Sequence, residues 1–190
     1  NLWAGTAVKD VSFKLHKGEI LGFSGLMGAG RTEVARLLFG ADKKESGSIV
    51  INGKEVSINS PQDAIREGIG YLSEDRKRFG CIVDMTIANN TVITNLDKYI
   101  KAVLIDDGAI IKASDKFVQS LHTKTPSSKQ LVRNLSGGNQ QKVVIAKWLE
   151  QNSDILIFDE PTRGIDVGAK SEIYTLMNDL VAQGKSIIMI

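Results

Sequence analysis

One stretch constrains the fold of this chain more than any other, because it joins a strand, a glycine-rich loop and a helix. The segment "GEILGFSG" is mostly apolar and predicts a buried strand that ends near Ser24. The loop "GLMGAGRTE" follows it, and a helical pattern then runs from Val34 to a stop at Gly40. A strand that leads through such a loop into a helix is typical of α/β domains that bind anions.

The rest of the chain repeats this alternation of strands and helices. The segments "DILIFDE" and "SIIMI" are apolar on both faces, as buried parallel strands are. The segment "VSFKL" alternates and predicts a further strand before a turn at Lys17–Gly18. Together these patterns predict an α/β fold with a mainly parallel sheet.

Local signals predict the shorter elements. Asn52–Gly53 predicts a β-hairpin, and Ser60 is expected to cap a short helix that stops at Gly68. Residues 82–133 carry helical patterns without strand signals and predict a helical insert. One later helix has an apolar stripe, formed by Ile173, Leu176, Met177, Leu180 and Val181.

The composition narrows the class of protein. The 190 residues are 42% hydrophobic and 24% charged, and a net charge of +2 does not favour nucleic acid or acidic lipid as the main partner. The single cysteine, Cys81, excludes an internal disulfide, and no apolar run approaches the roughly 20 residues of a membrane helix. His16 and His122 lack partners at catalytic or metal-binding spacing and are predicted to be structural. Both ends, Asn1 and Ile190, indicate a fragment of a longer protein.

The loop from Gly25 to Thr32 nearly matches the phosphate-loop pattern of Gly, four residues, Gly, Lys and then Ser or Thr. Its backbone N–H groups are expected to face an anion, and Thr32 is expected to offer its hydroxyl to Mg²⁺. Arg31 replaces the lysine, and it keeps the charge but is longer, planar and forked. Met27 is expected to pack beneath the loop. On this loop alone, a nucleotide site and a plain glycine-rich turn both stay open.

Two carboxylates, Asp159 and Glu160, end the strand "ILIFDE". In an α/β sheet, ligands bind at this end of the strands. Asp159 can hold Mg²⁺ through water, and Glu160 can orient and polarise an attacking water. Together with the loop, the two carboxylates favour a nucleotide-hydrolysing site over a strand end that they merely cap.

A second glycine turn opens a helix in the segment "LSGGNQQK". Its Ser136, Gly137 and Gly138 would form another anion-binding turn. Because one nucleotide needs only one phosphate loop, this turn is predicted to contact a nucleotide held by another domain. A plain Ser-Gly-Gly helix start is the alternative. The basic run "DRKR" is predicted to be a solvated loop.

In their order along the chain, these motifs resemble an ATP-binding-cassette (ABC) ATPase domain over nearly the whole sequence. "GLMGAGRT" is similar to its Walker A loop, "LSGGNQQK" to its signature, "ILIFDE" to its Walker B strand and "RGID" to its D-loop. A closer resemblance, to the second cassette of the tandem ATPases of bacterial ribose, galactose and xylose importers, is carried by "GRTE", "SEDRKR", "LSGGNQQK" and "DEPTRGIDVGAK".

The resemblance implies ATP and Mg²⁺ as cofactors and assigns roles by position. Glu160 would be catalytic, and the metal residues would be Thr32, Asp159 and Glu74, the last standing where most cassettes have a glutamine. Trp3 lies near the place of an adenine-stacking aromatic, although a surface aromatic is an equal alternative. The nucleotide-binding residues implied are Gly25, Gly28, Ala29, Gly30, Arg31, Thr32, Glu33, Trp3, Ser136, Gly137, Gly138 and Asp166.

The resemblance also implies an organisation and a setting. Residues 1–190 would be a single truncated phosphate-loop NTPase domain, with a core and small antiparallel β subdomain at 1–80 and 134–190 and a helical subdomain at 81–133. The implied partners are another cassette in the first half of the same chain, membrane permease subunits and, indirectly, a periplasmic sugar-binding protein, but no nucleic acid. The domain would lie peripherally at the cytoplasmic face of the bacterial inner membrane.

The departures from the family pattern lead to a hypothesis about catalysis. Arg31 and Glu74 alter the domain's own site, while the signature around Ser136 is intact. The domain is therefore expected to bind nucleotide, to hydrolyse it slowly and to support the site of a partner cassette. The alternatives are a non-catalytic cassette and a non-transport ABC ATPase acting on nucleic acid or ribosomes.

Overall fold

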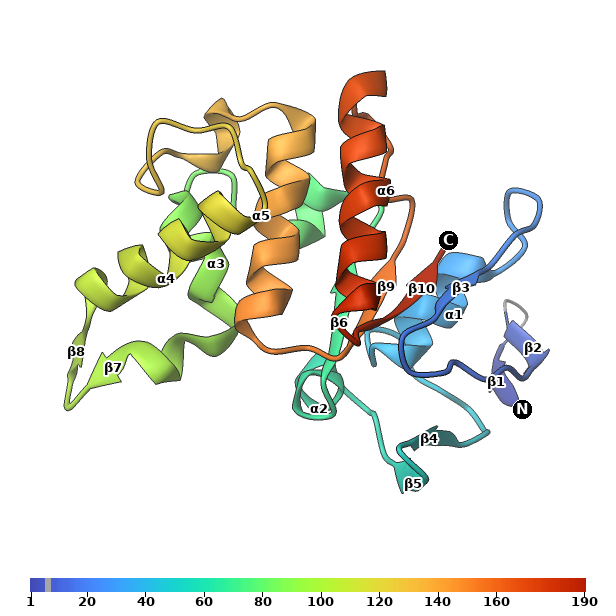
Figure 1. Cartoon of the computed structure of the whole chain (residues 1–190). Helices are drawn as coiled ribbons and strands as arrows, with labels where there is room; N and C mark the ends of the chain where they lie inside the picture. The colour runs from blue at the N-terminus through green and yellow to red at the C-terminus, as the bar shows by residue number, and fades with distance from the viewer. Residues whose placement is uncertain (6–7) are drawn as a thin grey trace. The chain divides into compact units, whose positions relative to one another are not determined.

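The computed structural model describes residues 1–5 and 8–190 (Figure 1). The chain forms two compact units, and each is described by itself. The first unit consists of Asn1–Tyr71, Ser153–Glu160 and Leu180–Ile190. The second unit consists of Leu72–Asn152 and Pro161–Asp179. None of the helices within the described ranges is long and apolar enough to cross a bilayer.

The first unit is built around a sheet with the strand order β3-β10-β9-β6 (Figure 1). β10 pairs in parallel with both β3 and β9, while β1–β2 and β4–β5 are small antiparallel pairs. The mainly parallel sheet and the antiparallel pairs confirm the predicted fold. The elements are β1 (Leu2–Ala4), β2 (Val8–Val11), β3 (Ile20–Gly22), α1 (Arg31–Leu38), β4 (Ile49–Ile51), β5 (Lys54–Val56), α2 (Pro61–Arg66), β6 (Ile69–Leu72), β9 (Ile155–Phe158) and β10 (Ser186–Met189).

Burial within this sheet depends on the position of each strand. Leu156, Ile157 and Phe158 of the interior strand β9 are fully buried, whereas the residues of β3 at the sheet edge are at most half-buried. The prediction of a buried strand before the glycine loop is therefore only partly right. The strand predicted for "VSFKL" is wrong beyond Val11, because β2 pairs with β1 only as far as that residue.

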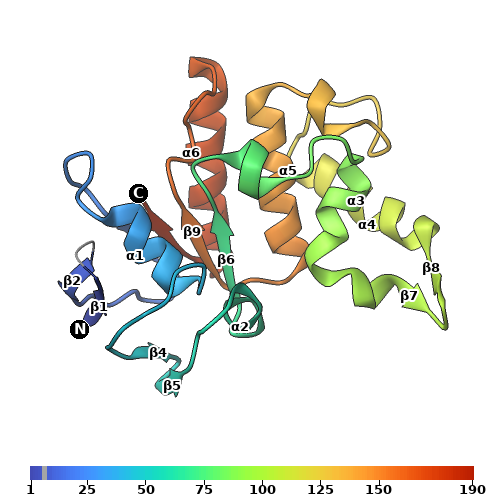
Figure 2. The same cartoon turned by 180° about the vertical axis from the view of Figure 1, so that it is seen from behind.

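Helix α1 lies beside the sheet in both views of the molecule (Figures 1 and 2). Its buried face is formed by Val34, Ala35, Leu37 and Leu38. Gly40 follows the helix with φ 69°, in the left-handed region, and a methyl group placed on it would lie 2.6 Å from the Ser60 carbonyl oxygen. The predicted stop at Gly40 is confirmed, and its glycine is required by both conformation and space.

Gly40→Ala is expected to lower the free energy of unfolding by about 2 kcal/mol more than Gly53→Ala does, since an added group must displace backbone. Gly53 is a matched control because its φ is 78° and nothing lies within 4 Å of the added methyl group. Urea denaturation of both variants measures the difference. Equal losses of stability would show that the Ser60 carbonyl moves aside freely.

The second unit is mainly helical, and α3 packs against both α4 and α5. One cluster of buried side chains in its interior is composed of Ala88, Val92, Tyr99 and Ile110. The elements are η1 (Arg76–Gly80), α3 (Ile87–Val92), η2 (Ile93–Tyr99), β7 (Ile100–Lys101), β8 (Leu104–Ile105), α4 (Asp107–Ser120), η3 (Val132–Asn134), α5 (Gly137–Glu150) and α6 (Val167–Ala182), the last ending in the first unit. The strand pair β7–β8 was not predicted, and the subdomain boundaries at 81 and 133 stay a prediction.

Candidate functional site

The loop between β3 and α1 curls into a tight turn before the helix. Gly28 (φ 80°) and Gly30 (φ 84°) adopt the left-handed backbone that favours glycine, and Gly30 is the N-cap of α1. The Ala29 N–H donates to the Leu26 carbonyl at 3.1 Å, which closes the turn. The N–H groups of the first turn of α1 lack acceptors within the helix, so this end attracts anions.

The prediction that Met27 packs beneath the loop is wrong. Met27 is 99% exposed and Leu26 is 85% exposed. The turn closed by Ala29 leaves both side chains at its outer tip, where no other described residue covers them. Neither side chain contributes to the core of the first unit.

Arg31 is the first residue of α1, and its side chain returns toward the start of the loop. A methyl group placed on Gly25 would lie 3.7 Å from the Arg31 Cδ and 3.2 Å from the Ala29 Cβ. Any larger residue at Gly25 would press on the other side of the loop. The structure thus places the Arg31 chain beside the loop that the sequence predicts to hold phosphates.

The strand end and the loop meet at Asp159. Its side chain is fully buried after β9, and its two oxygens have different donors in the first unit. The Thr32 hydroxyl donates to Oδ1 at 3.1 Å, and the Tyr71 hydroxyl donates to Oδ2 at 2.8 Å. The pairing of Thr32 with Asp159 agrees with the predicted metal residues. Tyr71 was missed, although a tyrosine in an apolar strand needs a partner for its hydroxyl.

The protonation of this network follows from its burial. Burial raises the pKa of Asp159, while the hydrogen bonds from Tyr71 and Thr32 and the positive charge of Arg31 lower it. Burial first, and then the charge of Asp159, raise the pKa of Tyr71 well above its ordinary value. The phenol therefore stays protonated and acts as a hydrogen-bond donor at neutral pH.

Glu160 differs from its neighbour in exposure and backbone conformation. It is exposed and has φ 49°, which is uncommon outside glycine. Its N–H donates to the Ile190 carbonyl at 3.1 Å, so the pairing of β9 with the end of the chain holds this conformation. The carboxylate is thus open to water, as its predicted role requires.

The oxygens of Thr32 and Asp159 fit a magnesium ion. Mg²⁺ prefers hard oxygen ligands and is usually bound by one or two protein groups together with waters and substrate phosphates. Within residues 1–5 and 8–190, no group of three or more His, Cys, Asp or Glu side chains could hold a metal by itself. The ion would therefore depend on nucleotide oxygens to complete its shell.

Trp3 lies on β1, where its backbone N–H donates to the Ser46 carbonyl at 3.2 Å. The residue is 39% exposed, so part of the ring is open to solvent. Its role in adenine stacking stays a prediction.

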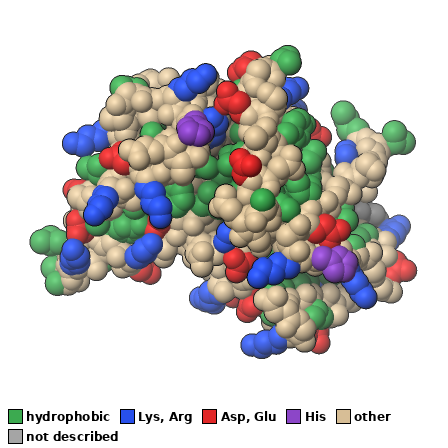
Figure 3. Space-filling view, viewed as in Figure 1, with side chains coloured by type: hydrophobic (Ala, Val, Ile, Leu, Met, Phe, Trp, Pro, Cys, Tyr) green, Lys and Arg blue, Asp and Glu red, His purple; other side chains and the backbone are tan. Residues whose placement is uncertain are grey.

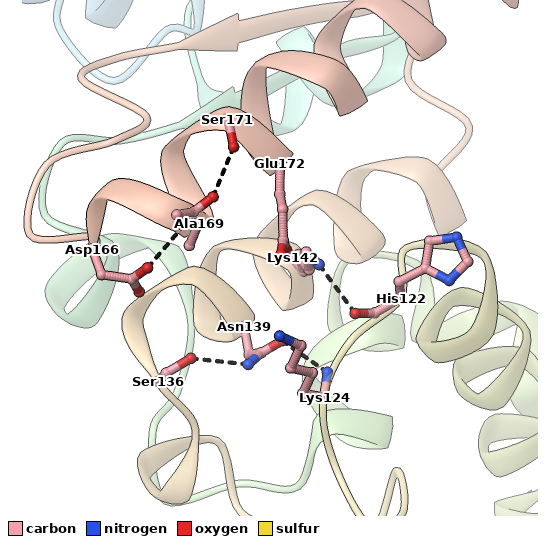
Figure 4. Close-up of polar contacts among 10 residues, drawn as sticks. His122, Lys124, Ser136, Asn139, Lys142, Asp166, Ala169, Ser171 and Glu172 are labelled. Carbon is pink, nitrogen blue, oxygen red and sulfur yellow. Dashed lines mark hydrogen bonds and ion pairs between the residues drawn. The ribbon is translucent and has the colours of Figure 1, made fainter.

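In the second unit, the signature residues form the start of α5 (Figure 4). Ser136 is the N-cap, yet its side chain makes no capping hydrogen bond to the backbone described here. Its hydroxyl oxygen instead accepts from the side-chain NH₂ of Asn139 at 2.9 Å. The side-chain oxygen of Asn139 in turn accepts from the backbone N–H of Lys124 at 2.8 Å. The Ser136 hydroxyl can therefore still donate a hydrogen bond to another acceptor.

Arg76 joins this helix to the loop before α6. Its guanidinium donates to the carbonyls of Arg163 (2.8 Å) and Gly164 (3.3 Å) and to the Gln140 side chain (3.3 Å). The prediction of a solvated loop for "DRKR" is only partly right: Asp75, Lys77 and Arg78 are exposed, but Arg76 is half-buried and begins the π-helical turn η1. No spacing signal could reveal this role, since its carbonyl partners lie 87 and 88 residues away.

Glu74 and Asp166 each have a defined partner in the second unit. The Glu74 carboxylate forms an ion pair with Arg163. The Asp166 Oδ1 accepts from the Ala169 N–H at 2.9 Å at the start of α6 (Figure 4). The assignment of Glu74 to metal and of Asp166 to nucleotide stays a prediction.

The first unit has the features that define a phosphate-loop NTPase: a parallel sheet, a strand–loop–helix cradle and an aspartate at a strand end beside the cradle. The sequence pattern of the ABC transporter family matches residues 8–163, and this chain belongs to that family.

Two relatives are similar over nearly the whole chain. The xylose import ATP-binding protein XylG of Thermoanaerobacter pseudethanolicus is 57% identical over 184 residues, which are 96% of this chain and 36% of the relative. The ribose import ATP-binding protein RbsA of Clostridium tetani is 52% identical over 191 residues, which are 100% of this chain and 38% of the relative. The chain thus spans little more than a third of the length of the curated relatives it matches.

A solved structure confirms the fold. A nucleotide-free ATP-binding cassette from an ABC transporter superposes with a TM-score of 0.81, at 22% identity, over 99% of this chain and 77% of the other. The predicted cassette fold, with its parallel sheet, antiparallel strand pairs and helices, is therefore confirmed.

Proposed function

We propose that this chain is the ATP-binding and ATP-hydrolysing cassette of a bacterial monosaccharide importer, and that it is the second cassette of a tandem polypeptide. The observation that carries the proposal is the network of Thr32, Asp159 and Tyr71, which joins the phosphate loop to the strand end. The sugar-import names of relatives above 50% identity support the substrate class.

The roles of the residues in ATP hydrolysis follow from their positions. The loop N–H groups and Arg31 would bind the phosphates, and Thr32 and Asp159 would hold Mg²⁺, which would supply positive charge against the phosphates. The exposed Glu160 orients water for in-line attack on the γ-phosphate. Because Arg31 replaces lysine, turnover at this site is expected to be slow.

The partners belong to the same proposal. Ser136 and the N-terminus of α5 offer donors to the nucleotide of the other cassette. The second unit exposes Val103 (90%) and Leu104 (73%) on the β7–β8 hairpin, where Figure 3 shows hydrophobic side chains near basic ones. This surface suits contact with permease subunits. A periplasmic sugar-binding protein would act through those subunits, with this domain at the cytoplasmic face of the membrane.

Arg31 variants of the 190-residue chain test the nucleotide site. Arg31→Ala is expected to weaken Mg-ATP binding about tenfold, because it removes a charged hydrogen-bond donor to phosphate. Arg31→Lys is expected to retain binding and to raise the slow hydrolysis. Calorimetry and phosphate release measure the two properties, and Met27→Ala is the control because Met27 is 99% exposed.

Two other results would change the conclusion. Absence of Mg-ATP binding by the wild type and by Arg31→Lys would refute the proposed function. Binding without hydrolysis in both would favour the alternative of a non-catalytic cassette that supports its partner.

A further inference from the structure

The carboxylate of Asp159 is buried and is held from two sides. Thr32 donates to one oxygen and Tyr71 to the other. The Tyr71 ring contacts the ring of Phe39, with 5.4 Å between centroids and a 43° angle between planes. Because packing fixes this ring, its hydroxyl is a donor in a defined place.

We propose that Tyr71 is a positioning residue for magnesium: its hydroxyl fixes Oδ2 of Asp159, so that Oδ1 stays directed at Thr32 and the metal position. The inference rests on the proposed function, because it assumes a magnesium nucleotide at this site. It adds a residue that the phosphate-loop and strand-end motifs do not include.

The two donors to Asp159 differ in their place relative to magnesium. A metal would bind the Thr32 hydroxyl through an oxygen lone pair, so Thr32 would contact the ion while it donates its proton to Oδ1. Tyr71 lies on Oδ2 and keeps its bond. Removing it would let a buried carboxylate rotate, and partners that orient a metal ligand typically contribute 10–100-fold to metal affinity.

The test uses Tyr71→Phe in the complete protein, with Tyr99→Phe as the matched control. Phenylalanine keeps the ring that contacts Phe39. Tyr99 is also a buried tyrosine whose hydroxyl donates to a carboxylate, that of Glu150 in the second unit. Photolabelling by azido-ATP is measured on peptides of this domain, with EDTA and with excess Mg²⁺. The readout is the magnesium-dependent gain, which is the half-saturating nucleotide concentration in EDTA divided by that in excess Mg²⁺.

We expect all three proteins to label equally, within about twofold, in EDTA, and the magnesium-dependent gain to fall about tenfold in Tyr71→Phe only. An unchanged gain in Tyr71→Phe would overturn the inference. So would a loss of labelling in EDTA confined to Tyr71→Phe, because the hydroxyl would then support the fold. No labelling of the wild type would overturn the proposed function as well.

A comparison in the Asp159→Asn variant tests whether Tyr71 acts by orienting this carboxylate or by supporting the fold. Asp159→Asn replaces the charge that Tyr71 is proposed to orient. If Tyr71 acts through this carboxylate, Tyr71→Phe adds nothing to the lowered magnesium gain of Asp159→Asn. An additional loss of similar size in the double variant would contradict the inference.

Discussion

If the proposed function holds, Gly137→Ala is expected to lower ATP hydrolysis by the complete protein about 100-fold, because a displacement near 1 Å in a catalytic assembly has an effect of this size. A methyl group on Gly137 would lie 2.8 Å from the Gly164 carbonyl oxygen and 2.7 Å from an Arg76 nitrogen. Arg76 joins the Gly164 carbonyl to Gln140 of α5, so neither the guanidinium nor the carbonyl can move away without loss of these hydrogen bonds. Alanine therefore pushes apart the signature turn and the loop that leads to Asp166.

The control is the same substitution at the start of another helix of the second unit. Gly108 is in the first turn of α4, and a methyl group there would lie 3.5 Å from the Asp106 side chain, an ordinary contact. Gly108→Ala should leave hydrolysis within about twofold of the wild type, because helix propensity favours alanine. ATP binding to the phosphate loop should be unchanged in both variants. Normal hydrolysis by Gly137→Ala would show that the signature turn of this domain does not act in catalysis.

The parts of the fold that the sequence predicts well are those decided by neighbouring residues. Ser60 caps α2, and its hydroxyl oxygen accepts from the Asp63 N–H, as its place before Pro61 predicts. Asn52 and Gly53, with φ 51° and 78°, form the predicted turn between β4 and β5. In each case a side chain or backbone preference acts within four residues, so no knowledge of tertiary structure is needed.

The parts that the sequence predicts poorly depend on partners far along the chain. Residues beyond Val11 alternate like a strand, but β1 offers no pairing there, and Phe13 instead packs edge-on against Phe23 with 5.0 Å between centroids. In the sequence, nothing distinguishes Arg76 of the "DRKR" run from a solvent-exposed basic residue. Only the tertiary structure brings its guanidinium to the carbonyls of Arg163 and Gly164.

The residues of the candidate site also differ in whether the sequence predicts them. Thr32 and Asp159 are each predicted to hold Mg²⁺, and they meet in the structure because the ends of parallel strands and the loop after a strand share one edge of the sheet. Tyr71 precedes Asp159 by 88 residues and belongs to no motif, so its contact follows only from the order of the strands. Motifs therefore identify the groups that act on the ligand, while the residues that orient those groups come from the structure.

Lys147 provides the second large effect, because it is a cation buried in the second unit. It is 7% exposed, its Nζ donates to the Gly80 carbonyl at 2.6 Å, and burial lowers its pKa from 10.5 to about 8. The neighbouring Cys81 acts in the opposite direction on this pKa. Between pH 8 and 10.5, the folded chain has released a proton that the unfolded chain still binds, so stability must rise with pH across this window.

The rise is measured as a difference between two proteins. From 10.5 − 8, or about 2.5 pKa units, the free energy of unfolding of the wild type should rise by about 3 kcal/mol relative to Lys147→Met between pH 7.5 and 10.5. Cys81→Ser is placed in both proteins, because burial raises the pKa of the Cys81 thiol. The thiol would otherwise titrate in the same pH range as the lysine. Well below pH 8 the lysine is charged in both the folded and the unfolded protein, so the difference in free energy of unfolding should be constant there. A difference independent of pH up to 10.5 would show that Lys147 keeps its charge when buried, and that its bond to the Gly80 carbonyl offsets the loss of hydration.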